Sequence, residues 1–164
     1  MANIEGWIQE LPPFSVVIMR GIPGSGKTST AVRIGEESFL VWDICSADHH
    51  FVDPNTGAYL FIPNELPHAH QECFRHFTEA LNRNDELVIV DNTNIQLAHY
   101  LQYEQAAQVH EYNFFVVEIV QRNAAEVQLC FHRNIHGVPQ ATINRMHVSL
   151  IRQPDNRAFL VNMH

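Results

Sequence analysis

The chain has 164 residues, of which 46% are hydrophobic and 17% are charged, a composition typical of one compact folded domain rather than a disordered segment. Its net charge of −8, with histidine neutral, disfavours tight non-specific binding of duplex nucleic acid. No apolar run is long enough for a membrane span, and the three distant cysteines predict neither a disulfide framework nor a zinc knuckle.

The first thirteen residues lack the basic and apolar regions of a secretory signal, so we expect a cytoplasmic protein without membrane contact. Ile4, Trp7, Ile8 and Leu11 recur at helical spacing. They predict a short amphipathic helix on the domain edge, for which a dimer contact is a second interpretation. We therefore expect an N-terminal edge segment at 1–13 and a single domain at 14–164.

From residue 14 onward, strand-like and helix-like patterns alternate, which is typical of an α/β domain with a mostly parallel sheet. Short apolar runs predict strands at 14–20, 40–46, 87–91, 113–120 and 158–161. Apolar stripes or caps predict helices at 27–37, 68–83, 96–110, 123–132 and 143–151. The expected fold is a three-layer P-loop kinase fold with five strands flanked by helices. The loop at 48–63 is long enough to suggest a binding role.

The first predicted strand runs into Gly-Ile-Pro-Gly-Ser-Gly-Lys-Thr at 21–28, which matches the phosphate-loop pattern G-x-x-x-x-G-K-[ST]. Its glycines let backbone N–H groups surround phosphate oxygens, and the following helix adds the positive end of its dipole. Lys27, the only lysine, is expected to neutralise the β and γ phosphates, and Thr28 to ligate Mg²⁺. The predicted nucleotide-binding residues are Gly21, Ile22, Pro23, Gly24, Ser25, Gly26, Lys27, Thr28 and Thr30.

Two other nucleotide-binding classes are disfavoured because their motifs are missing from the sequence. The dinucleotide pattern G-x-G-x-x-G does not occur. The guanine-reading Asn-Lys-x-Asp tetrad would need a second lysine. A strand before the loop and a helix after it also disfavour a chance match, so the segment predicts an ATP site.

Acidic residues follow two predicted strands, at the edge where ligands bind in doubly wound sheets. We interpret Asp48 as the general base for the acceptor hydroxyl, with a helix or turn cap as the structural alternative. We interpret Asp91 as a residue of the Mg²⁺ shell, directly or through water. Its structural alternative is turn chemistry within 91–94.

Phosphoryl transfer also needs positive charge beside the transferring group. Arg122 and Arg133 are the candidates, and a solvated surface arginine is the alternative for each. We favour Arg133 as catalytic because 133–137 interrupts a helical pattern where a mobile lid, at 133–139, would be useful.

Eleven histidines raise the question of a metal site. None forms H-E-x-x-H or a Cys/His set with zinc-ligand spacing. A structural or surface role is therefore favoured for the paired ones, which are His49, His50, His68 and His70.

Four segments occur in an order that resembles the polynucleotide 5′-hydroxyl-kinase-like P-loop ATPases, a family that includes the kinase domain of NEDD4-binding protein 2. They are the phosphate loop, Ser46-Ala47-Asp48, Val88-Ile89-Val90-Asp91-Asn92-Thr93-Asn94 and Arg133-Asn134-Ile135-His136-Gly137-Val138-Pro139. The resemblance implies ATP-dependent phosphorylation of a 5′-hydroxyl end, with Asp48 as base and Arg133 as lid arginine. After the base, where phage-type members carry a second acid and an arginine, this chain has His49, His50 and Phe51.

Three hypotheses for the acceptor stay open. The first is the 5′ end of a single-stranded nucleic acid, the second is a small metabolite or nucleoside, and the third is an ATP-binding interaction module without efficient transfer. The acidic charge favours the second and third, whereas the strand-end and lid motifs favour the first. ATP and Mg²⁺ are the expected cofactors, and the oligomeric state is not predicted.

Overall fold

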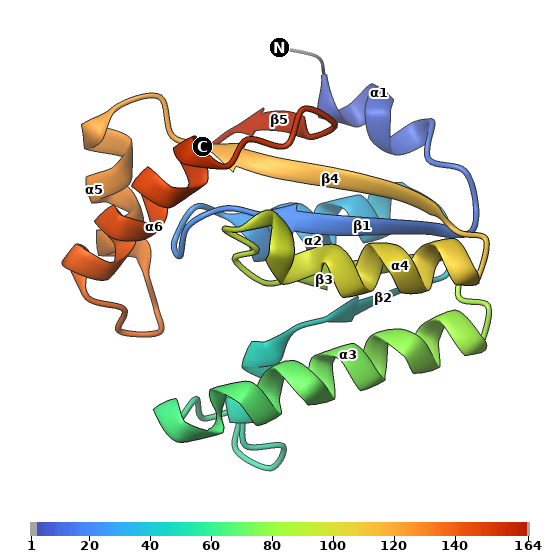
Figure 1. The fold of residues 1–164 in the computed structure, drawn as a ribbon, viewed down its shortest axis with the longest axis horizontal. Helices are drawn as coiled ribbons and strands as arrows, with labels where there is room; N and C mark the ends of the chain where they lie inside the picture. The colour runs from blue at the N-terminus through green and yellow to red at the C-terminus, as the bar shows by residue number, and fades with distance from the viewer. Residues whose placement is uncertain (1–2, 164) are drawn as a thin grey trace.

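A computed structural model describes residues 3–163 as a three-layer arrangement of helices on both faces of a five-stranded sheet (Figure 1). Met1, Ala2 and His164, the outer ends of the two predicted segments, lie outside the described residues. The strand order is β2-β3-β1-β4-β5, and every neighbouring pair is parallel. The predicted three-layer α/β fold is confirmed. The strands are β1 (Ser15–Arg20), β2 (Trp42–Cys45), β3 (Leu87–Asp91), β4 (Asn113–Val120) and β5 (Phe159–Asn162).

The central strands β1 and β3 are buried along their whole length. This is expected of strands in a parallel sheet that is covered on both faces, and it explains why they read as continuous apolar runs. The register places Met19 of β1 opposite Asp91 of β3 and Val117 of β4. The carboxyl ends of these strands therefore meet at one edge of the sheet.

Alternate residues of β1 enter two separate cores. Val17 and Met19 pack with α1 (Ile4–Gln9) and α2 (Lys27–Glu37). Val16 and Ile18 pack with α3 (Leu66–Asn82) and α4 (Leu101–Val109) on the other face. The predicted helix at 96–110 begins as a 3-10 turn, Leu97–Tyr100, before α4. The N-terminal helix contributes a fully buried side chain, Ile8, to the first core.

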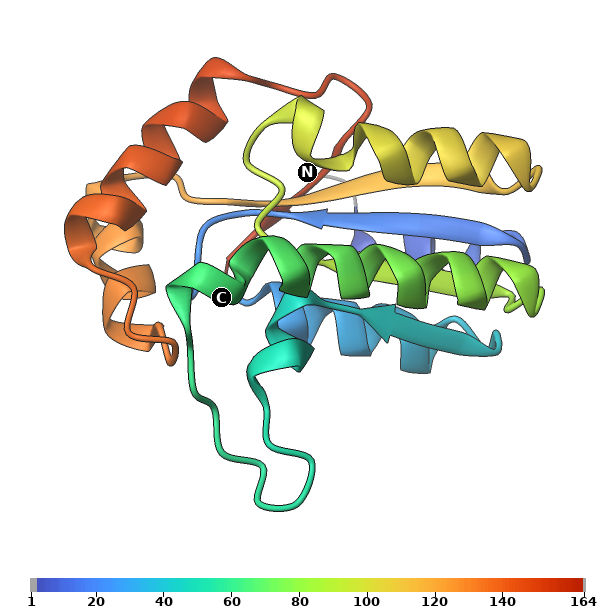
Figure 2. The same ribbon diagram turned by 60° about the horizontal axis from the view of Figure 1, so that its bottom comes forward.

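Two further helices, α5 (Ala124–Arg133) and α6 (Gln140–Arg152), lie together beyond the carboxyl edge of the sheet (Figure 1). The loop between β2 and α3 leaves the same end and projects away from the rest of the domain before it returns to the start of α3 (Figure 2). It begins with the 3-10 helix η1 (Ala47–Phe51) and ends with η2 (Pro63–Glu65). Among the described residues, no helix is long and apolar enough to cross a membrane.

Candidate active site

A cavity of about 910 Å³ opens at the carboxyl edge of the sheet, between the phosphate loop, the ends of β2 and β3, and the segment 133–139. Most of the predicted site residues line this single cavity. They are Pro23, Gly24, Ser25, Gly26, Lys27, Thr28, Thr30, Asp48, Asp91 and Arg133. The two remaining predicted residues, Gly21 and Ile22, are buried at the base of the loop and do not line it.

The phosphate loop has a conformation that glycine adopts readily and other residues rarely adopt. Gly24 and Gly26 have φ of 77° and 97°, in the left-handed region. A Cβ on Gly24 would lie 2.0 Å from the carbonyl oxygen of Cys130, so the loop is packed directly against α5. The buried hydroxyl of Ser25 has no hydrogen-bond partner among the described residues. Such an orphan is what a loop built to receive a phosphate oxygen would leave.

Lys27 is held inside the loop, where its Nζ donates a 2.9 Å hydrogen bond to the carbonyl of Ile22. Burial lowers the pKa of its ammonium group, and the nearby carboxylates of Asp91 and Asp48 oppose that shift. A bound polyphosphate would add negative charge beside this ammonium and further favour its protonated form. The loop therefore presents a fixed cation to the cavity.

Asp91 faces the first turn of α2, and its Oδ2 accepts a 2.6 Å hydrogen bond from the Thr28 hydroxyl. Burial raises the pKa of Asp91, whereas the hydrogen bond from Thr28 and the charge of Lys27 oppose that rise. A carboxylate and a hydroxyl at the end of a phosphate loop are the oxygen donors that suit Mg²⁺. The residue types at this point therefore fit the metal predicted from the sequence.

The residues that follow Asp91 join three strands at the edge of the sheet. The side-chain oxygen of Asn92 accepts a hydrogen bond from Ala47 N (2.9 Å), next to Asp48. The carbonyl of Thr93 accepts from Gly21 N (2.9 Å), and Asn94 donates to the carbonyl of Met19 (2.8 Å). Residues 91–94 thus fix the position of the phosphate loop relative to Ala47 and the neighbouring Asp48.

Asp48 lies in η1, and the cap of this short helix is Ser46, whose hydroxyl accepts from Asp48 N at 3.2 Å. The carboxylate of Asp48 is therefore not used as a cap and lines the cavity. Its Oδ1 accepts a 3.1 Å hydrogen bond from the Tyr59 hydroxyl, and its Oδ2 lies 3.4 Å from His136 Nε2. Burial and the adjacent Asp48 raise the pKa of Tyr59, which therefore remains a protonated donor.

Tyr59 and His136 were not assigned roles from the sequence, although Tyr59 falls in the loop at 48–63 that was expected to bind and His136 falls in a segment that carries the family resemblance. Their rings lie 4.2 Å apart, centroid to centroid, so the long loop and segment 133–139 touch above Asp48. Hydrogen bonds from Asn134 to the Val138 carbonyl (2.8 Å) and from His136 N to Asn134 Oδ1 (3.1 Å) hold the segment in a compact turn. No local spacing in the sequence indicates this contact.

The two candidate arginines differ in position. Arg133 ends α5 and lies on the cavity wall with an exposed side chain. Arg122 forms an ion pair with Glu126 (2.6 Å) and does not line the cavity. The structure therefore favours the surface interpretation for Arg122 and keeps Arg133 as the candidate.

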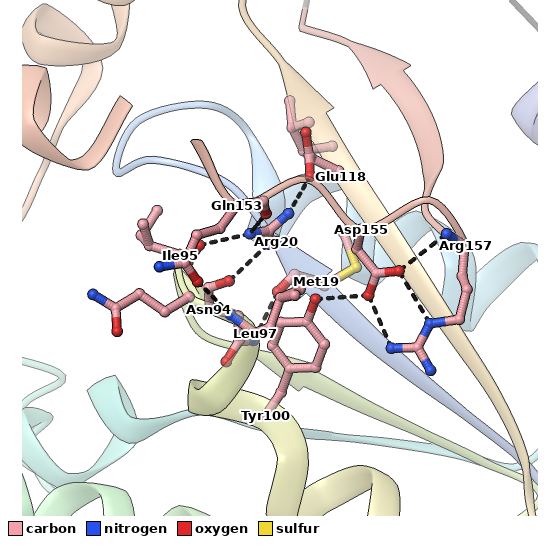
Figure 3. A network of polar contacts seen from close by, with 12 residues as sticks. Met19, Arg20, Asn94, Ile95, Leu97, Tyr100, Glu118, Gln153, Asp155 and Arg157 are labelled. Carbon is pink, nitrogen blue, oxygen red and sulfur yellow. Dashed lines mark hydrogen bonds and ion pairs between the residues drawn. The ribbon is translucent and has the colours of Figure 1, made fainter. Parts of the chain in front are cut away.

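Arg20, the last residue of β1, directly precedes the phosphate loop and is the centre of a buried network (Figure 3). Its side chain donates to the carbonyls of Asn94 (2.9 Å) and Ile95 (2.6 Å), to that of Gln153, and to the Glu118 carboxylate (2.8 Å). The Arg20 guanidinium carbon also lies 6.0 Å from the centroid of the Tyr100 ring, and the Tyr100 hydroxyl and Arg157 both contact the Asp155 carboxylate (Figure 3). The sequence shows Arg20 only as the end of an apolar strand, so this positioning role was missed.

A family model described as an AAA domain matches residues 16–150, most of the chain. The chain belongs to this family. NEDD4-binding protein 2 from Homo sapiens is 30% identical over 131 residues, which is 80% of this chain and 7% of that protein. YLP motif-containing protein 1 from Rattus norvegicus is 28% identical over 82% of this chain and 11% of its own length. The chain thus spans only a small part of these relatives.

Solved structures with a similar fold include kinases. A gluconokinase from Sinorhizobium meliloti 1021 matches with a TM-score of 0.59 and 15% identity, over 93% of this chain and 84% of that one. A chain of the Pnkp1/Rnl/Hen1 RNA repair complex matches with a TM-score of 0.65 and 19% identity, over 86% and 45%. The fold is that of the P-loop kinases, and the predicted resemblance to a polynucleotide-kinase-like P-loop family is confirmed.

Proposed function

We propose that the protein is an ATP- and Mg²⁺-dependent phosphotransferase that moves the γ-phosphoryl group to a hydroxyl acceptor. The observation that carries the proposal is that the phosphate loop and the Asp48 carboxylate line one cavity. Donor phosphates and an acceptor hydroxyl could be brought together there, which is most of what phosphoryl transfer requires of a protein.

On the donor side, the backbone N–H groups and the Ser25 hydroxyl would hold the phosphates, and Lys27 would neutralise their charge. Thr28 and Asp91 would hold Mg²⁺, which when bound neutralises charge on the phosphate oxygens. Arg133, on the lid segment 133–139, would add positive charge near the transferring group.

On the acceptor side, Asp48 would take the proton of the hydroxyl as its oxygen bonds to the γ-phosphorus. The bond from that phosphorus to the ADP oxygen breaks in the same transfer, and the proton later leaves Asp48 for solvent. Tyr59 and His136 would keep the carboxylate oriented between the two segments that carry them.

The acceptor we put first is a polynucleotide 5′-hydroxyl end. Two of the similar proteins support this choice: NEDD4-binding protein 2 in sequence, and a chain of an RNA repair complex in fold. Tyr59, Phe61 and His136 also give the cavity wall aromatic surfaces on which a terminal base could stack. The net charge of −8 favours a short end over a long duplex.

The proposal is tested with γ-labelled ATP and a panel of 5′-hydroxyl oligonucleotides, nucleosides and sugars. Asp48→Asn should lower the transfer rate at least about a hundredfold while ATP still binds, because it removes the base and not the phosphate loop. Asp53→Asn is the matched control, since Asp53 lies in the same loop but not on the cavity wall. It should leave transfer unchanged.

Two results would contradict the proposal at different levels. Transfer to a sugar or nucleoside but to no oligonucleotide would show that the acceptor is a small molecule and not a polynucleotide end. ATP binding without transfer to any acceptor would leave an ATP-binding interaction module in place of the enzyme.

A further inference from the structure

Two histidines and two glutamates gather on the outer side of η1, away from the lining of the ATP cavity. Glu72 Oε2 lies 2.6 Å from His50 Nδ1, and Glu72 Oε1 lies 3.1 Å from His68 Nε2. The other ring nitrogen of His50, Nε2, lies 3.6 Å from Glu65. These residues come from η1, η2 and α3, so the fold and not a local motif brings them together.

We propose that His50, His68 and Glu72 form a binding site for a divalent transition-metal ion of the Zn²⁺ class. One potential ligand atom from each residue lies within 4.8 Å of the others, so that small side-chain movements would complete a coordination shell. Two imidazole nitrogens and a carboxylate oxygen are donors that Zn²⁺ takes, whereas Mg²⁺ and Ca²⁺ take oxygen. Three protein ligands leave one position for water.

The position of Glu65 supports a metal site independently of the three ligands. His50 Nδ1 faces Glu72 while its Nε2 faces Glu65. A carboxylate on the second ring nitrogen is the usual partner of a metal-binding histidine, because it fixes the tautomer and the ring orientation. The side chain of His50 is only 16% exposed, and at 3.6 Å its Nε2 needs to move only a few tenths of an ångström to come within hydrogen-bond distance of Glu65.

A second histidine-containing group in the described residues, Asp43, Cys45 and His76, fits a metal less well. Arg83 already lies 3.1 Å from the Asp43 carboxylate, so a cation would compete with a guanidinium. Burial raises the pKa of the Cys45 thiol, which disfavours the thiolate that a metal needs. A variant of the Asp43, Cys45 and His76 group can therefore serve as a control for metal binding at His50, His68 and Glu72.

The proposed metal would tie η1 to the beginning of α3. Asp48 precedes His50 by two residues in η1, and Leu60 N donates to the carbonyl of Phe51 at the end of η1. Holding η1 against α3 would also hold the loop that carries Tyr59. The site is separate from the phosphate loop, so its occupancy can be measured whether or not the protein transfers phosphate.

The test is a Co²⁺ titration of the full chain, followed by visible absorption in excess Mg²⁺, with Zn²⁺ added afterwards to displace the cobalt. The expected result is tetrahedral cobalt bands without a sulfur charge-transfer band, lost on addition of Zn²⁺. His68→Ala and Glu72→Gln should each weaken binding at least about tenfold. His132→Ala and His76→Ala are controls and should not change it.

Absence of cobalt bands in the unmodified protein would overturn the proposal. Unchanged affinity in both His68→Ala and Glu72→Gln would overturn it as well. Loss of the bands in His76→Ala would assign the metal to the Cys45 group instead. His68 is exposed, and near-UV circular dichroism of each variant would confirm that loss of binding is not loss of fold.

Discussion

The Arg20 network and the phosphate loop are neighbours in the chain, but their polar groups are partnered differently. The Arg20 side chain is fully buried and donates to three carbonyls and a carboxylate. In the loop, the buried Ser25 hydroxyl has no partner among the described residues, and Lys27 reaches one carbonyl of its own loop. Buried polar groups are normally paired, so the first region stabilises the fold, whereas the second has the unpartnered hydroxyl expected of a loop that receives a ligand.

Replacing Arg20 should break the first region most severely. Arg20→Met leaves Glu118 and the carbonyls of Asn94, Ile95 and Gln153 without their buried donor. We expect the free energy of unfolding to fall by about 3–5 kcal/mol, the usual result of breaking a buried charge pair. Urea denaturation measures it. Arg75→Met is the control and should cost less than about 1 kcal/mol, since its ion pair with Glu79 is exposed. A similar cost for both would contradict the account.

Changing Gly24 should damage the second region with less effect on the first. A Cβ there would meet the Cys130 carbonyl at 2.0 Å, so Gly24→Ala must displace the loop. A displacement of about 1 Å costs on the order of a hundredfold in activity, and we expect that loss in phosphoryl transfer. Gly57→Ala is matched, because Gly57 also has positive φ but has open space around its Cβ position. Equal losses of transfer in the two variants would contradict the close approach to Cys130.

Asp155, at the rim of the Arg20 network, should show a smaller and pH-dependent effect. Its hydrogen bond from Arg157 lowers its pKa from 3.8 to about 2. The ionised carboxylate of Asp155 therefore contributes to the free energy of unfolding above about pH 4, and this contribution is lost as the pH falls through 2. Asp155→Asn should cost about 1–2 kcal/mol near pH 7, allowing for screening at the exposed Arg157.

Urea denaturation of the protein and of Asp155→Asn, repeated at decreasing pH, measures this effect. The difference in unfolding free energy should shrink as the pH falls below about 4. In an Arg157→Met background the same difference should be smaller at every pH, because the main cause of the shift is gone. A difference that stays constant with pH would contradict the assigned ion pair.

The parts of the fold that the sequence predicted are those governed by local pattern. The bounds of α2, β3 and β4 agree with the prediction, because their apolar residues are buried on continuous faces and breakers flank them. The phosphate loop was recognised because its chemistry lies in consecutive residues.

The missed features all depend on contacts between distant segments. Arg20 meets the carbonyl of Gln153, Asp48 meets His136, and His50 meets His68 only in the folded chain. The structural or surface role predicted for the paired histidines rested on sequence spacing alone, and it stays a prediction. Spacing cannot show that η1 and the first turns of α3 lie together.

The central claim is that the phosphate loop is complete only with a nucleotide, and thermal unfolding with and without ATP·Mg²⁺ tests it most directly. At a nucleotide concentration about a hundred times its Kd, binding should raise the free energy of unfolding by about 2.7 kcal/mol, which corresponds to a Tm increase of roughly 5–10 °C. We expect Lys27→Ala to unfold close to the unmodified protein without nucleotide and to show no increase with it. An equal increase in both proteins would contradict the account.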